Sequence, residues 1–165
     1  MMTTLVYLSM AIAAAFLTAA TIKRRALPDS ISAIVYDLPH TWQWFWTVWM
    51  WAVAITVGIP LIDVLPDNLQ LFGFAKMTLL CFVGAMPLVR HESNTAHYIL
   101  AIIAGFLSQV CVLAVSPAWL LTWLLMVVVY VDKRLSRTAL ADKAVLLSEL
   151  ICAGTLYGAL LQSIN

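Results

Sequence analysis

Two ionisable residues lie deep inside long apolar segments of this chain. Lys76 is found in LFGFAKMTLL and Glu149 in LLSELICAGTLYG. A charge within such a segment is costly unless it is paired or hydrated, which makes both residues functional candidates. Together with Asp63, they could line a polar pathway between helices. The alternative for Lys76 is that its flexible stem lifts the ammonium toward Asp63 or Asp67 at the end of the segment.

A second group of candidates consists of histidines and acids near the ends of apolar segments, namely Asp37, His40, His91, Glu92 and His97. With Glu149, these side chains could bind a divalent metal or relay protons. His97, Glu149 and Asp37 are candidates for both roles, with His40 added as a catalytic candidate and His91 as a metal ligand. This hypothesis requires His97 and Glu149 to lie within about 6 Å of each other.

The spacing of this second group is weak support for chemistry. His91 and His97 are six residues apart in the sequence, and no HExxH signature is present. The same residues could simply solvate a loop. The sequence names no cofactor, and whether the chain is an enzyme stays open.

Composition determines which class of protein can position these residues. Hydrophobic residues make up 64% of the 165 residues and charged residues 10%, whereas a soluble domain carries roughly 25% charged residues. A soluble fold is therefore excluded, and the lipid bilayer becomes the expected partner. No basic run suggests nucleic acid. The cysteines, Cys81, Cys111 and Cys152, lie in apolar runs without a CxxC pair and are interpreted as core residues.

The apolar segments are long enough for membrane-spanning helices, which need about 20 residues each. The expected spans are 4–22, 42–61, 69–89, 98–115, 118–131 and 144–162. These predict a single all-α integral membrane domain over residues 1–165, built as a bundle of about six transmembrane helices. The fifth segment is the shortest. If it does not span alone, it forms a re-entrant hairpin with the fourth and the count falls to four.

Basic residues predict the orientation, because Lys and Arg in short loops stay in the cytoplasm. Eight of the nine basic residues fall in alternate loops, and only Lys76 lies within a span. The eight are Lys23, Arg24, Arg25, Arg90, Lys133, Arg134, Arg137 and Lys143. Both termini are therefore expected outside the cytoplasm, in a multi-pass protein of a bacterial inner membrane.

The segment between the first two spans, residues 26–41, is too polar to cross a membrane. Ile31, Ile34, Val35 and Leu38 recur at helical spacing after Pro28. We expect a short cytoplasmic interfacial helix whose apolar stripe packs against the bundle or the lipid headgroups. The tryptophan-rich span that follows is expected to contact neighbours on two faces.

Small residues predict where helices approach closely. Ala11, Ala15 and Ala19 repeat on the first span, and Gly154 and Gly158 form GxxxG on the sixth. These faces could pack within one chain, or they could join a second copy or another membrane protein.

The helical face of Lys76 is also marked by small residues. Gly73, Gly84 and Pro87 fall on the same side of the third span as the lysine. We therefore expect Lys76 to face protein or a water-filled cavity, with an acid or carbonyl groups as its partner. Asp63 is the nearest candidate by depth, and Glu149 is the alternative through a water molecule.

The order LPDSIS, a tryptophan-rich span, PDNLQ, GAMPL and HYI resembles a group of small multi-span membrane proteins of Bacteroidetes bacteria and their phages. The resemblance covers about residues 27–115. It implies a bacterial inner membrane and assigns no activity and no functional residue.

Three functions fit these features. The first is a small channel or transporter with a polar pathway involving Lys76, Glu149 and Asp63. The second is a non-catalytic membrane partner or scaffold. The third is a membrane-embedded enzyme acting on a lipid or isoprenoid through the His, Asp and Glu cluster. Substrate, ion and oligomeric state do not follow from the sequence.

Overall fold

The computed structural model describes residues 1–88, 94–135 and 142–164, and every regular element in these ranges is a helix. Five stretches are long and apolar enough to cross a membrane, which confirms the all-helical class. They are Met2–Arg24, His40–Val64, Asp67–Leu88, Thr95–Val115 and Ala144–Ile164. The helices within them are α1 (Met2–Arg24), α2 (Gln43–Val64), α3 (Gln70–Ala85), α4 (Asn94–Val115) and α7 (Ala144–Ile164).

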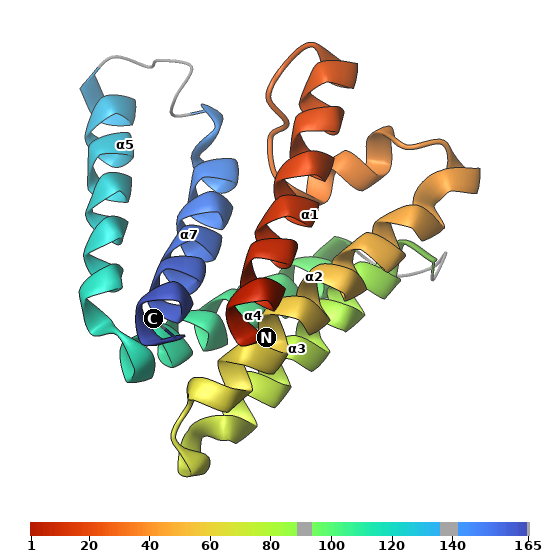
Figure 1. The fold of residues 1–165 in the computed structure, drawn as a ribbon. Coiled ribbons are helices and arrows are strands. Elements are labelled where there is room, and N and C mark those ends of the chain that lie inside the picture. Colours follow the sequence, from red (N-terminus) through yellow and green to blue (C-terminus); the bar gives the residue numbers. More distant parts are fainter. Residues whose placement is uncertain (89–93, 136–141, 165) are drawn as a thin grey trace.

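The fifth expected segment is helical but shorter than the others. It begins as the 3-10 helix η5 (Pro117–Trp123) and continues as α5 (Leu124–Leu135), and its apolar part is Pro117–Asp132. α4 has spanning length by itself, whereas the apolar part of the fifth segment is shorter. After α4 the chain turns back, and α5 runs beside α7 (Figure 1).

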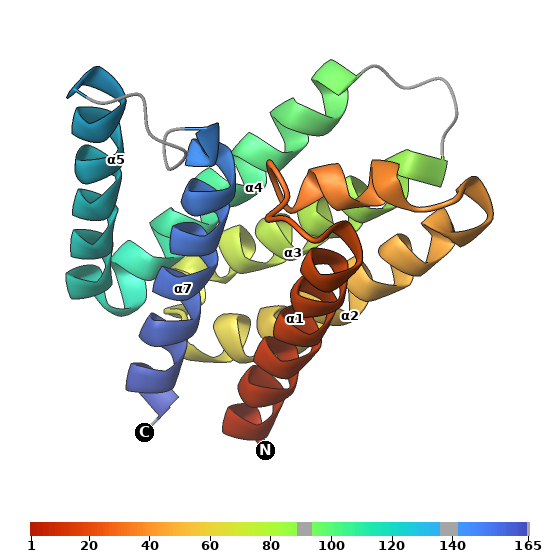
Figure 2. The same cartoon turned by 90° about the horizontal axis from the view of Figure 1, so that it is seen from above.

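The helices pack mostly in chain order. α2 packs against α1 and α3, α3 against α4, and α4 against α7, which also contacts α1 and α5. The two termini lie at the same end of the molecule in both views (Figures 1 and 2).

Glycines bring α2 and α3 together. A Cβ atom at Gly84 of α3 would lie 2.6 Å from Cβ of Met50 on α2, and one at Gly73 would lie 3.0 Å from a side-chain atom of Ile62. Both glycines are buried. The interface is therefore built on backbones that approach more closely than larger residues allow.

Aromatic residues of α2 contact both neighbouring helices. The Trp49 ring stacks on Phe16 of α1 with centroids 4.2 Å apart, and its indole N–H donates to the Ile12 carbonyl at 3.1 Å. On the other side of α2, the Trp51 indole donates to the Cys81 carbonyl of α3 at 2.9 Å. The expectation that this span contacts neighbours on two faces is confirmed.

The segment after α1 packs against the bundle as the sequence pattern indicates. Ile34 and Val35 are 2% and 0% exposed and join a core cluster with Trp46 of α2. The helix is shorter and tighter than expected, because it forms 3-10 turns at η1 (Ser32–Asp37) and η2 (His40–Trp42). Pro39 separates these turns, since it cannot donate the backbone hydrogen bond that would continue a helix.

Candidate functional site

Lys76 is buried inside the bundle. Its side chain is 3% exposed, and Gly73, Val83 and Gly84 of the same helix are buried with it. The expectation that Lys76 faces protein rather than the surrounding medium is confirmed. Its position in the middle of α3 places an ammonium among helices that are otherwise apolar.

Three cysteines lie in the wider surroundings of Lys76. They are Cys152 on α7, Cys111 on α4 and Cys81 on α3. All three are free rather than joined in disulfides. The sequence pattern indicates only core residues at these positions, because spacing does not show which helices pack together.

The expected acid partner of Lys76 is missing from the described part of the chain. Within residues 1–88, 94–135 and 142–164, no hydrogen bond or ion pair reaches the ammonium. Asp63, the nearest candidate by depth, is exposed and makes no ion pair with Lys76. The reason is geometric, because Lys76 points into the bundle and Asp63 lies on its outside.

A polar cluster is shared by α4, α7 and η5. The Gln109 amide donates to the Cys152 thiol at 3.1 Å, and the Gln109 oxygen accepts from Thr155 at 3.0 Å and from the Trp123 indole at 2.8 Å. Ser108 is buried and also hydrogen-bonds the Cys152 thiol. These hydrogen bonds join three elements of the bundle.

Sequence reasoning missed this cluster, although a signal for it was present. Ser108 and Gln109 are adjacent polar residues within the apolar run 98–115, and Thr155 interrupts the apolar run of the last span. Polar residues inside a membrane helix usually hydrogen-bond across to another helix. Their partners, however, depend on how α4 and α7 pack.

Glu149 is hydrogen-bonded to the segment that joins α1 and α2. Its carboxylate accepts hydrogen bonds from the backbone N–H groups of Ile31 and Ser32 and from the Ser32 hydroxyl. These residues begin η1, so Glu149 anchors the segment between α1 and α2 to α7. A carboxylate held in this way is not the partner of Lys76.

The other expected site residues do not converge in the described structure. Asp37 forms an ion pair with Arg24 at 3.0 Å, and His40 is exposed. His97 is 4% exposed, and neither ring nitrogen has a hydrogen-bond partner among the described residues. His91 and Glu92 lie outside the described ranges. Among residues 1–88, 94–135 and 142–164, no three His, Cys, Asp or Glu side chains are placed to hold a metal ion.

The two expected small-residue faces differ in whether they pack against other parts of the chain. Gly158 packs within the chain, because a Cβ atom there would lie 2.6 Å from the Trp119 ring, whereas nothing lies within 4 Å of a Cβ at Gly154. Ala11, Ala15 and Ala19 are all exposed on α1. The alanine face is thus not used for packing within the described chain.

Comparison with known proteins identifies no relative of this chain. No protein-family model, no curated protein and no solved structure matches the chain. The proposals below therefore rest on the residues and their geometry.

Proposed function

We propose that this chain is a small multi-pass channel or transporter of a bacterial inner membrane, and that Lys76 is the binding centre for a small anion. The supporting observation is a lysine side chain that is 3% exposed and forms no ion pair with any described residue. An uncompensated charge in a medium of low dielectric constant is expensive, and a bound anion would offset that cost.

The surroundings of Lys76 also suit a small anion. The Cys152 thiol, the Gln109 amide and the Ser108 hydroxyl form one hydrogen-bonded group on α4 and α7, and such neutral groups can donate hydrogen bonds to an anion. They carry no negative charge when neutral, so they would not repel an anion. Glu149 then serves the pathway by holding the segment between α1 and α2, and Asp63 lies at the outer end of α2.

The number and direction of the membrane crossings are part of the same proposal. We infer six crossings, of which α5, the fifth along the chain, is the shortest. Both termini lie outside the cytoplasm, and the loops rich in Lys and Arg lie inside it. Placing both termini at one end of the bundle agrees with this arrangement (Figure 2).

Flux through liposomes tests the function. Purified protein is reconstituted, and efflux of chloride is compared with efflux of sodium while the membrane potential is clamped. We expect chloride efflux in wild type and its loss in Lys76→Met. Thr78→Met is the matched control, because Thr78 lies on the exposed side of the same helix. Equal chloride efflux in Lys76→Met and wild type would contradict the proposal.

A second candidate function is a non-catalytic membrane partner. It is favoured by the exposed alanine face of α1, formed by Ala11, Ala15 and Ala19, because small exposed residues on a membrane helix allow close approach of another helix. Ala15→Ile would then dissociate an oligomer or complex that wild type forms in detergent. Unchanged assembly of this variant would remove the candidate.

A further inference from the structure

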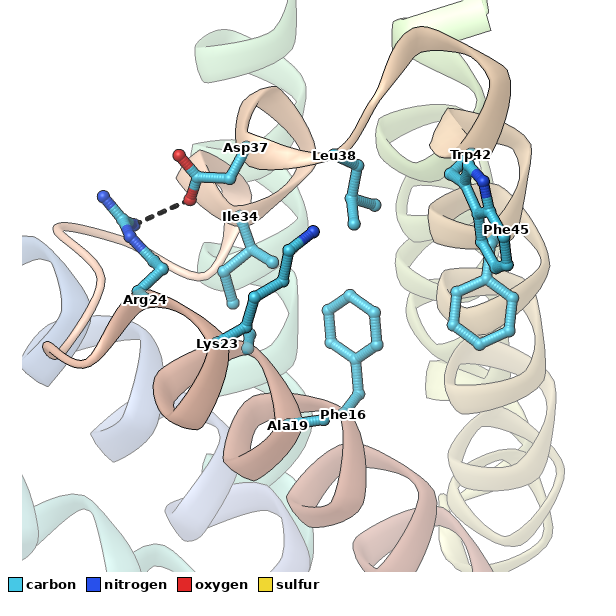
Figure 3. Close-up of a pocket in the computed structure, with 10 residues that line it drawn as sticks. Phe16, Ala19, Lys23, Arg24, Ile34, Asp37, Leu38, Trp42 and Phe45 are labelled. Carbon is cyan, nitrogen blue, oxygen red and sulfur yellow. Dashed lines mark ion pairs between the residues drawn. The ribbon is translucent and has the colours of Figure 1, made fainter.

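A cavity with mainly apolar walls lies at the end of the bundle opposite the termini. A cavity of about 190 Å³ opens between α1, η1 and the start of α2. Phe16 and Ala19 of α1, Ile34 and Leu38 of the η1 segment, and Phe45 of α2 form its apolar walls (Figure 3). These walls come from three elements, so the cavity is a product of tertiary packing.

Two cations and one acid line the same cavity. Arg24 pairs with Asp37, whose carboxylate oxygen lies 3.0 Å from the guanidinium. Lys23 has no acid partner among the described residues, and its side chain extends into the space between Ile34 and Leu38 (Figure 3). The lining therefore carries one net positive charge, from two cations and one anion.

The Arg24 guanidinium is already occupied by an acid. Its Nη1 atom is buried and lies 3.0 Å from the Asp37 carboxylate, so it is not available to a ligand. The Lys23 ammonium has no acid partner among the described residues and can bind the oxygens of a phosphate group. The apolar walls directly beside it can bind a hydrocarbon chain.

We propose that this cavity binds an anionic phospholipid, with its phosphate at Lys23 and the first part of an acyl chain along Phe16 and Phe45. Trp42 at the rim is 58% exposed and fits the interfacial level of a membrane protein. A zwitterionic lipid is disfavoured, because Asp37 already pairs with Arg24 and no free acid lines the cavity for a choline group. The proposal does not rest on the transport function.

Retention of lipid by the full chain in detergent tests the site. Phosphatidylglycerol and phosphatidylcholine with identical acyl chains are titrated, and bound lipid is counted by native mass spectrometry. We expect phosphatidylglycerol to be preferred, and Lys23→Gln to weaken its binding about tenfold or more through loss of a charge-assisted hydrogen bond. Arg25→Asn is the matched control, since Arg25 is adjacent, basic and outside the cavity lining.

Further measurements distinguish binding of a lipid phosphate from binding of free inorganic phosphate. Ala19→Leu, which fills the cavity and keeps both cations, should also weaken phosphatidylglycerol binding and serves if Lys23→Gln does not fold. Inorganic phosphate at millimolar concentration should not displace the lipid. Equal retention of the two lipids by wild type, equal loss in Arg25→Asn, or displacement by inorganic phosphate would overturn the proposal.

Discussion

At the scale of single residues, Lys76 is the least expected side chain of the bundle. Long amines in membrane helices usually reach the interface or pair with an acid. Lys76 does neither, because it is 3% exposed on a helix packed between α2 and α4, and it forms no ion pair among the described residues. Its presence costs free energy in the unliganded protein, and this cost is what a bound anion would reduce.

Replacing Lys76 by Met should therefore stabilise the unliganded protein. Met has a similar length and no charge, so we expect the free energy of unfolding to rise by roughly 1–3 kcal/mol. Denaturant unfolding in detergent, followed by tryptophan fluorescence, measures this change. Thr78→Met should stay within about 0.5 kcal/mol of wild type. A less stable Lys76→Met would show that the ammonium has a favourable partner in the folded chain.

Glu149 gives the second prediction at this scale. Removing its carboxylate leaves the N–H groups of Ile31 and Ser32 without an acceptor, at a cost of about 1–3 kcal/mol for a buried donor. Glu149→Leu should thus speed amide hydrogen exchange at residues 31–38. Glu149→Gln keeps an acceptor oxygen and should lie closer to wild type. Identical exchange in Glu149→Leu and wild type would refute the anchoring role.

Elements meet most closely where α2 crosses α3. The new methyl group in Gly84→Ala would lie 2.6 Å from Cβ of Met50, which is too near the backbone to move aside easily. We expect a loss of about 1–3 kcal/mol from overpacking. Gly154→Ala is the matched control, because its Cβ meets nothing within 4 Å and Ala favours a helix by roughly 0.5–1 kcal/mol. If both variants showed the same melting temperature, the close approach at Gly84 would be disproved.

The sequence predicts the elements well, because each depends on a local pattern. Apolar length places the spans within a few residues of α1, α2, α3, α4 and α7, and the glycines of α3 correctly indicate the side on which Lys76 is buried. The stripe of Ile34 and Val35 likewise predicts that the η1 segment packs on the bundle.

The partners of each polar residue could not be predicted in the same way. Depth along a helix suggested Asp63 for Lys76, but the rotation of each helix about its axis decides which residues meet. That rotation turns Asp63 outward, whereas Lys76 is buried. The partners of Glu149 could not be predicted either, because its hydrogen-bond donors are backbone N–H groups, which leave no signature in the side-chain sequence.

At the scale of the whole molecule, polar contacts join segments that are far apart in the chain at the end opposite the termini. Lys143 at the start of α7 hydrogen-bonds Asp29 at 2.6 Å and the Leu27 carbonyl at 2.9 Å. The hydrogen bond and positive charge of Lys143 lower the pKa of the Asp29 carboxyl, which keeps it ionised. These contacts join the segment between α1 and α2 to the start of the last helix.

Every proposal made here depends on a multi-pass bundle with alternate loops on opposite sides of a membrane. The direct measurement is labelling of single cysteines by a membrane-impermeant maleimide in intact cells, in a background where Cys81, Cys111 and Cys152 are replaced by Ala. We predict that Asp67→Cys is labelled from outside, and that Arg134→Cys is labelled only after the inner face is opened. Labelling of Arg134→Cys but not Asp67→Cys in intact cells would reverse the orientation, and labelling of both would contradict the bundle.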